Sequence, residues 1–262
     1  MNNKSPLRYP GGKTRACKTL DTILKEHFDL SLFNTIVSPF FGGGSFEFYI
    51  QNTYHLNIIA NDKFIPLYHF WISCKFNNTL LCEELKEKIN MIDKEIFTIM
   101  RQTIMDEQNQ LKQSILYFII NRCSFSGATL SGGFSLESSK KRFTMSSIER
   151  IENLDLSRFN IYNLDFEDFI QHNQDEKNIL FLDPPYYLEK GSKLYGNNGD
   201  MHIHFNHDKL YKCLSTKKNW IMTYNNCDYI KNLYKDYLII DVNWSYGMNK
   251  SKASSEIIIL SK

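Results

Sequence analysis

The sequence predicts an α/β protein whose open sheet is interrupted by a helical insertion. Short apolar runs of strand length occur toward both ends of the chain and alternate with helix-like stretches, whereas the middle, from about 80 to 122, has helical spacing with few glycines or prolines. With 262 residues, 42% of them hydrophobic, the chain is long enough to bury one large core, or one core with an inserted lobe.

The first two predicted strands flank a glycine cluster. FNTIVSPF (33–40) is an apolar run that ends in the glycines of FGGGSFEFYI, and NIIANDKF (57–64) repeats the pattern with an acid at its end. This order predicts a strand, a tight loop, a helix and a second strand.

The insertion follows this second strand and its helix. Residues 80–122 predict helices, and the Ser- and Gly-rich segment after them predicts a polar hairpin or loop at about 122–147. From about residue 160 strand-like runs return, with helix-like stretches such as HDKLYKCL and CDYIKNLY between them. These runs are FNIYNL, NILFL, NWIMTY, YLIIDV and EIIIL.

Positive charge is concentrated in two segments, although the formal net charge is only +2. Residues 1–20 carry five basic residues and no acid, and residues 121–150 carry five basic and two acidic residues. Such local patches on a nearly neutral chain favour local contacts to phosphates.

Several classes of protein and site are disfavoured. No run of eighteen apolar residues occurs, and MNNKSPLRYPGGK lacks the apolar core of a signal peptide, so we expect a soluble, cytoplasmic protein with no membrane partner. The six cysteines form no C-x-x-C pair, which favours reduced structural thiols. His202, His204 and His207 lie in a predicted loop without further ligands, so we expect no metal site.

The glycine cluster favours a nucleotide-type cofactor. Gly42, Gly43 and Gly44 at the carboxyl end of a strand allow a sharp turn and a close approach to a ligand, and Asp62, at the end of the next strand, can accept from ribose hydroxyls. The spacing matches neither G-x-G-x-x-G nor the phosphate-binding G-x-x-x-x-G-K-[ST] loop.

The stretch FLDPPYYLEK (181–190) places an acid directly behind a buried strand. Pro184 and Pro185 cannot continue a sheet ladder, so the chain leaves the sheet at Asp183, on the edge where open α/β sheets bind ligands. The Asp183 carboxylate and the Pro184 carbonyl then form a pair of acceptors, and Tyr186 offers a flat face. The predicted guest is a planar heterocycle that carries an exocyclic amino group.

These motifs resemble those of a known family. FFGGGS (40–45) and DPPY (183–186) are similar to the glycine and catalytic motifs of S-adenosylmethionine-dependent DNA adenine-N6 methyltransferases, and LRYPGGKTR (7–15) to the N-terminal cofactor motif of their Dam-like alpha group, the D12 class. INRCSFSG (120–127) with RFTMSSIERI (142–151) resembles the target-recognition segments of that class, and TYNN (223–226) its late structural motif.

The resemblance implies a fold and a division of the chain. The fold would be a Rossmann-like methyltransferase domain with a seven-stranded mixed sheet, made of residues 1–70 and 155–262. Residues 71–154 would form an inserted, mainly helical target-recognition lobe.

The resemblance also assigns roles to individual residues. Asp183, Pro184 and Tyr186 would be catalytic. Residues that would bind S-adenosylmethionine, and release S-adenosylhomocysteine, are Tyr9, Lys13, Phe40, Phe41, Gly42, Gly43, Gly44, Ser45, Asp62, Asp165, Phe166 and Asp183. Residues that would contact DNA are Arg122, Ser124, Phe125, Ser126, Lys140, Lys141 and Arg142. At Ser38, the family usually has Glu or Asp, and the loss of that acid would weaken cofactor binding unless a water replaces it.

The expected activity is methyl transfer to N6 of an adenine flipped out of double-stranded DNA. The adenine amino lone pair is delocalised into the ring, and acceptors such as Asp183 and the Pro184 carbonyl favour the more tetrahedral nitrogen that attacks a methyl group. The resemblance places such an enzyme in a restriction-modification or Dam-like system, as a monomer or weak dimer without a stable complex with a cognate endonuclease. An RNA adenine methyltransferase, a protein-glutamine methyltransferase and a catalytically silent DNA-binding relative remain alternatives.

Overall fold

The computed structural model describes residues 3–173, 175–187, 205–244 and 254–261. Within these residues, seven strands form one mixed sheet in the order β3-β2-β1-β4-β5-β7-β6. The five strands from β3 to β5 are parallel, and β7 is antiparallel to both β5 and β6. The strands are β1 (Thr35–Ser38), β2 (Asn57–Asn61), β3 (Phe159–Tyr162), β4 (Asn178–Leu182), β5 (Trp220–Asn225), β6 (Leu238–Trp244) and β7 (Ser254–Leu260).

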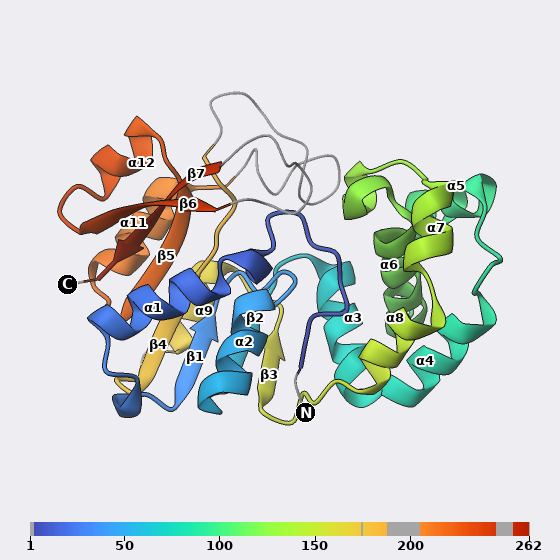
Figure 1. Ribbon diagram of the computed structural model, residues 1–262, viewed down its shortest axis with the longest axis horizontal. Coiled ribbons are helices and arrows are strands. Elements are labelled where there is room, and N and C mark those ends of the chain that lie inside the picture. The colour runs from blue at the N-terminus through green and yellow to red at the C-terminus, as the bar shows by residue number, and fades with distance from the viewer. Residues whose placement is uncertain (1–2, 174, 188–204, 245–253, 262) are drawn as a thin grey trace.

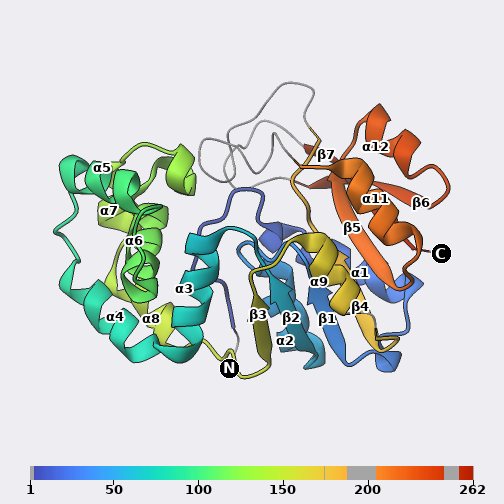
Figure 2. The same cartoon turned by 180° about the vertical axis from the view of Figure 1, so that it is seen from behind.

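Helices cover both faces of the sheet. Figure 1 shows α1 (Cys17–His27) and α2 (Ser45–Tyr54) on one face, and Figure 2 shows α9 (Phe166–His172) and α11 (His207–Ser215) on the other. Strand side chains alternate between two apolar cores: Ile179 and Phe181 of β4 pack with α1 and α2, and Leu180 and Leu182 with α9 and α11. The predicted α/β architecture is confirmed.

A group of helices lies beside the β3 edge of the sheet (Figure 1). In the sequence these helices lie between β2 and β3, and we expected the insertion after the second strand and its helix. Its members are α3 (Ile65–Phe76), α4 (Asn78–Glu87), α5 (Lys94–Thr103), α6 (Gln110–Cys123), α7 (Leu136–Arg142) and α8 (Met145–Glu152). We call this group the helical lobe. Its buried side chains are continuous with the core under α1 and α2.

The hairpin or loop expected over 122–147 is confined to residues 124–135, and helix α7 and the start of α8 follow it. Ser124 and Phe134 form only an isolated antiparallel bridge, and two short 3-10 turns, at Phe125–Gly127 and Thr129–Ser131, lie between them. Helix α7 begins after Ser135, whose side chain caps it by accepting from the Ser138 amide. The composition of this segment suggested a loop, but the Ser135 side chain provides a cap that allows a helix to begin there.

Three other helices start where a side chain satisfies one of their first amides. Asp93, Asn109 and Asn206 each accept from a backbone N–H of the helix that follows, which are α5, α6 and α11. Two 3-10 turns, η1 (Lys13–Arg15) and η2 (Leu30–Leu32), flank α1, and α12 (Asp228–Leu233) precedes β6.

Among the described residues no helix is both long and apolar enough to cross a bilayer. All six cysteines are free thiols.

Candidate active site

The centre of the sheet brings the two main sequence motifs together. β1 and β4 are neighbouring parallel strands, with Val37 opposite Leu180 in the register. The chain continues from β1 toward β2 on one side, whereas β4 lies on the other side, so their carboxyl ends form the switch point where open α/β sheets bind ligands. Ser38 ends β1 and Asp183 follows β4 directly, which places the glycine loop and the DPPY segment side by side.

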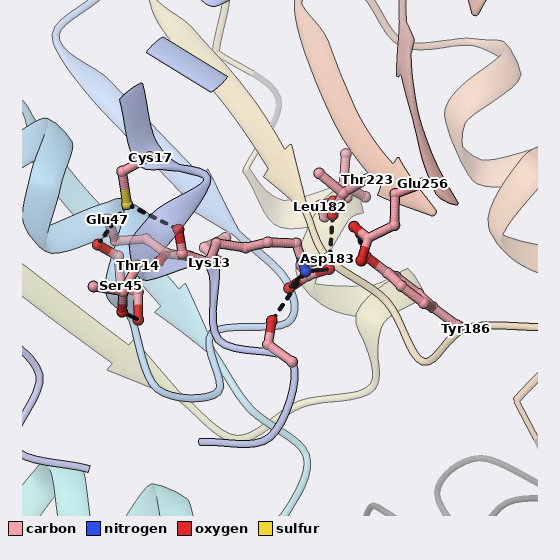
Figure 3. Close-up of polar contacts among 12 residues, drawn as sticks. Lys13, Thr14, Cys17, Ser45, Glu47, Leu182, Asp183, Tyr186, Thr223 and Glu256 are labelled. Atoms are coloured by element: carbon pink, nitrogen blue, oxygen red, sulfur yellow. Dashed lines mark hydrogen bonds and ion pairs between the residues drawn. The ribbon is translucent and has the colours of Figure 1, made fainter. Parts of the chain in front are cut away.

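Asp183 is held by a lysine and a threonine (Figure 3). Lys13 Nζ donates to both carboxylate oxygens, at 2.8 and 2.7 Å, and to the carbonyl of Gly11 at 3.1 Å. Thr223 Oγ1, from β5, donates to Asp183 Oδ1 at 2.7 Å. Lys13 is only 4% exposed, whereas the Asp183 side chain is 24% exposed. The carboxylate is therefore fixed in direction while remaining partly accessible.

Tyr186 is anchored at its hydroxyl. The hydroxyl donates to Glu256 Oε2 at 2.7 Å, and Glu256 is buried in β7 opposite Asn225. The Tyr186 ring stacks on Tyr224, and Lys13 Nζ lies 5.2 Å from the Tyr186 ring centre. Pro184 is buried. The three residues predicted to be catalytic therefore lie in one rigid segment that begins at the end of β4.

Tyr187 has a packing role that the sequence did not reveal. Its ring stacks on Tyr229 of α12, with ring centres 4.3 Å apart, and its edge meets His207 of α11. Asn225 Nδ2 donates to the Tyr187 carbonyl at 2.7 Å. Tyr187 thus fastens the DPPY segment to the helices on that face of the sheet.

Of the three histidines weighed for a metal site, His202 and His204 lie outside the described residues, and no metal-ligand cluster occurs among those described.

The glycine loop is shaped by Tyr9. Gly42 and Gly44 have positive φ angles of 51° and 66°, which side chains disfavour. A Cβ atom added to Gly42 would lie 2.8 Å from the Tyr9 ring, and one added to Gly43 would lie 2.7 Å from Tyr9 Cβ. Tyr9 therefore closes over the loop, and the glycines permit its close approach. Phe41 is buried in the core beneath the loop.

Asp62 lies beside this loop with its carboxylate oriented by backbone amides. Gly42 N donates to Oδ2 and Phe64 N to Oδ1, each at 2.9 Å. Burial raises the pKa of Asp62 to about 6, although these two hydrogen bonds oppose the rise. Each carboxylate oxygen retains a lone pair after accepting one amide, so the group can still accept from a ligand hydroxyl.

Asp165 and Phe166 lie at the start of α9. The Asp165 side chain accepts from Glu167 N and pairs with Lys63 at 2.8 Å, so it caps the helix. Phe166 packs in a cluster with Phe40 and Phe205, whose ring centres are 5.4 to 5.7 Å apart. An aromatic face and a carboxylate of this kind, together with Asp62 and the glycine loop, fit a cofactor that has an adenine ring and a ribose.

Glu47 is a site residue that sequence reasoning missed. It lies in the first turn of α2, is 2% exposed, and its Oε1 accepts from Ser38 Oγ at 2.5 Å. Burial raises the pKa of Glu47 to about 7, a rise that the Ser38 hydrogen bond opposes. Thus a carboxyl group does lie beside Ser38, but it comes from the helix. The available signal was an acid within the otherwise apolar run FEFYI (46–50).

The residues predicted to bind DNA are divided between surface and interior. Phe125 is 69% exposed, and Lys140, Lys141 and Arg142 are exposed on α7. Ser126 is half-buried with a positive φ of 53°, and Ser124 is buried, with Oγ accepting from Thr129 N.

Arg122 differs from the expectation of a surface phosphate contact. It is buried, and its guanidinium donates to the carbonyls of Arg142 at 2.8 Å and Pro6 at 3.2 Å. Burial, followed by the nearby charges of Arg150 and Arg8, lowers the pKa of Arg122 to about 10. Arg122 therefore ties the N-terminal segment to the helical lobe.

Comparison with known proteins agrees with this geometry. The chain is 24% identical over 265 residues to the Type II methyltransferase M.MjaIII of Methanocaldococcus jannaschii, an alignment that covers 91% of this chain and 90% of the relative. Residues 9–248 match the model of a single family, and this range contains the glycine loop, the helical lobe and the DPPY segment. The chain therefore belongs to the family of D12 class N6 adenine-specific DNA methyltransferases.

Proposed function

We propose that this enzyme transfers a methyl group from S-adenosylmethionine to N6 of an adenine flipped out of duplex DNA, as the methyltransferase of a type II restriction-modification system. The observation that carries the proposal is the oriented, partly exposed Asp183 carboxylate beside the anchored Tyr186 ring. The Type II methyltransferase with which the chain aligns over most of its length supports the biological setting.

Each part of the site has a role in this reaction. S-adenosylmethionine, when bound, supplies an electrophilic methyl group on a sulfonium. Asp62 accepts from the ribose hydroxyls, and Phe166 with Asp165 holds the adenine ring of the cofactor. Tyr9 covers the glycine loop and excludes water from it.

The target adenine is held at the other side of the site. Asp183 and the Pro184 carbonyl accept from its amino group, which orients the nitrogen lone pair toward the methyl group. Tyr186 stacks on the ring and offsets part of the cost of extrusion, which is about a few kcal/mol.

The helical lobe is proposed to recognise the target duplex, and the sheet, with residues 1–70 and 155–262, to carry the chemistry. The exposed Phe125 ring fills the gap left by the flipped adenine, and Lys140, Lys141 and Arg142 contact phosphates. Arg122 supports this surface from inside, because it bonds to the Arg142 carbonyl.

Methyl transfer from labelled S-adenosylmethionine tests the chemistry. Asp183→Ala should abolish incorporation into duplex DNA and leave cofactor binding largely intact, whereas Asp241→Ala, at an exposed carboxylate on β6, should leave incorporation unchanged. Undiminished transfer by Asp183→Ala would refute the assignment. RNA is assayed in parallel, since preferential labelling of RNA would favour that alternative. Single-molecule sequencing of DNA from a host that expresses the enzyme identifies the modified base and its sequence context.

Salt dependence of DNA binding tests the recognition surface. Changing Lys140, Lys141 and Arg142 together to Ala should reduce the slope of log K against log salt by about 0.9 for each phosphate that these side chains neutralise. The matched control removes the same charge from exposed lysines elsewhere, at Lys212, Lys218 and Lys235. Equal slopes for the two triple variants would leave the α7 residues as ordinary surface charge.

A further inference from the structure

The N-terminal segment, residues 3–12, lies between the two halves of the proposed site. Figures 1 and 2 show it, in dark blue, running between the sheet and the helical lobe. Two neighbouring residues of this segment contact opposite sides. The Tyr9 ring closes over the glycine loop, whereas Arg8 packs against the lobe, where a Cβ atom added to Gly127 would lie 2.7 Å from Arg8 Cβ. A shift of this segment would therefore change contacts on both sides.

Asn121, in the last turn of α6, holds this segment from the lobe. Its Oδ1 accepts from the Arg8 N–H at 3.0 Å, and its Nδ2 donates to the Arg8 carbonyl at 2.7 Å. The same Nδ2 donates to Thr129 Oγ1 at 3.1 Å. Asn121 is fully buried, so loss of any of these bonds would leave a polar atom unpaired away from water. One side chain thus ties the backbone of Arg8 to the turn that begins at Thr129.

The loop on the other side of Asn121 has a strained backbone. We call residues 124–131 the recognition loop. In it Ser126 and Thr129 have positive φ angles of 53° and 49°, which side chains disfavour, especially a β-branched one. Such conformations persist only where surrounding contacts hold them. At Thr129 these contacts include the Asn121 amide and the hydroxyl of Ser124, which accepts from Thr129 N at 3.0 Å. The conformation of the recognition loop therefore depends on Asn121.

We propose that Asn121 is a positioning residue that couples cofactor binding to DNA binding. The inference rests on the proposed function, because it takes the glycine loop as the cofactor site and the exposed Phe125 of the recognition loop as a DNA contact. When cofactor is bound, Tyr9 is fixed over the glycine loop, and the adjoining Arg8 backbone fixes the Asn121 amide. The amide in turn holds the recognition loop in the conformation that receives DNA. By linkage, DNA strengthens cofactor binding by the same factor.

A purely structural role for Asn121 makes a different prediction. If the residue only joined the N-terminal segment to the lobe, its loss would lower stability. Each affinity would then change by the same factor with and without the other ligand. We define the coupling factor as the dissociation constant of DNA without S-adenosylhomocysteine divided by the dissociation constant with it. Only a coupling role for Asn121 makes this factor depend on its amide.

The experiment measures the coupling factor in the full chain. A duplex with the methylated sequence found by sequencing is titrated with and without saturating S-adenosylhomocysteine, and S-adenosylhomocysteine is titrated with and without the duplex. For the wild type we expect a coupling factor of about fivefold or more, equal in the two directions. A wild-type factor of one would overturn the inference.

Asn121→Asp tests the amide. Asp has nearly the same size and still accepts from the Arg8 N–H, but it has no donor. We expect the coupling factor to fall to about one. The matched control is Asn3→Asp, because the buried Asn3 amide likewise donates twice, to Gln51 Oε1 and the Asp155 carbonyl, and accepts once, from Asp155 N. The control should keep the wild-type factor, and an equal loss in both variants would overturn the inference.

Thr129→Val tests the other end of the link. It keeps the shape of the side chain and removes the hydroxyl that Asn121 contacts, so it should also lower the coupling factor. In the Thr129→Val background, Asn121→Asp should cause little further change in the factor, which a double-mutant cycle measures directly. Thermal melting confirms that each variant is folded, and if Asn121→Asp does not fold, an unchanged factor in Thr129→Val overturns the inference.

Hydrogen exchange supplies a readout that needs neither DNA nor turnover. S-adenosylhomocysteine should slow amide exchange in residues 124–131 of the wild type and have little effect on them in Asn121→Asp. Exchange that does not slow in the wild type would contradict the coupling. 

Activity separates this inference from the proposed function. Methyl transfer to DNA by the wild type, together with a coupling factor that Asn121→Asp leaves unchanged, would overturn the inference alone. Absence of methyl transfer to DNA by the wild type would instead refute the proposed function.

Discussion

Replacing Glu47 with Gln should make the protein more stable in alkaline solution. The pKa of Glu47 rises from 4.5 to about 7 on folding, mainly because burial disfavours the charged form. A carboxyl whose pKa is raised on folding contributes stability that is complete below pH 4.5 and is lost as pH rises through 7. At about 1.4 kcal/mol per pKa unit, the loss amounts to about 3 kcal/mol by pH 8. Gln keeps the Ser38 hydrogen bond without this loss.

Thermal melting at two pH values measures the effect. For a chain of this size, about 3 kcal/mol corresponds to a rise in Tm of roughly 6–12 °C at pH 8. The difference between variant and wild type should be much smaller at pH 5, where Glu47 is already protonated. Glu26→Gln, on the exposed side of α1, should change Tm little at either pH. Equal Tm differences for Glu47→Gln at pH 5 and pH 8 would refute the reasoning.

Two other substitutions probe contacts that hold the site together. Gly43→Ala places a Cβ atom 2.7 Å from Tyr9 Cβ and should destabilise the protein by about 1–3 kcal/mol in urea unfolding, whereas Gly133→Ala, with no atom within 4 Å, should not. Tyr186→Phe leaves the buried Glu256 without its hydroxyl partner and should lower kcat/KM by about tenfold, whereas an unchanged kcat/KM would show that the anchor is dispensable.

The strands and the position of the catalytic segment were predictable because they depend on local patterns. A run such as NILFL has the length and composition of a buried strand, and two prolines after an acid end it at one place. The structure confirms β4 at Asn178–Leu182, with Asp183 next in the chain. Composition was less reliable in the insertion, where Ser-rich sequence suggested a loop over residues that include α7.

The direction of individual side chains was not predictable from the sequence. Arg122 lies in a basic segment, but two backbone carbonyls from distant residues draw its guanidinium into the interior. Glu47 lies nine residues after Ser38, yet the turn at the glycine loop brings the two side chains into contact. Composition and spacing carry no information about such contacts, because they depend on how helices pack on the sheet.

The sequence by itself determined the order of strands and helices, the glycine loop, the DPPY segment and the family to which they belong. Only the tertiary structure decided which charges share the site. Lys13 and Asp183 are separated by 170 positions and meet because η1, which carries Lys13, packs on α2 at the edge of the sheet where β4 ends. Glu47 is buried beside them because α2 packs against the same face. Burial turns ordinary charged residues into a coupled set, since few water molecules remain to solvate each one separately.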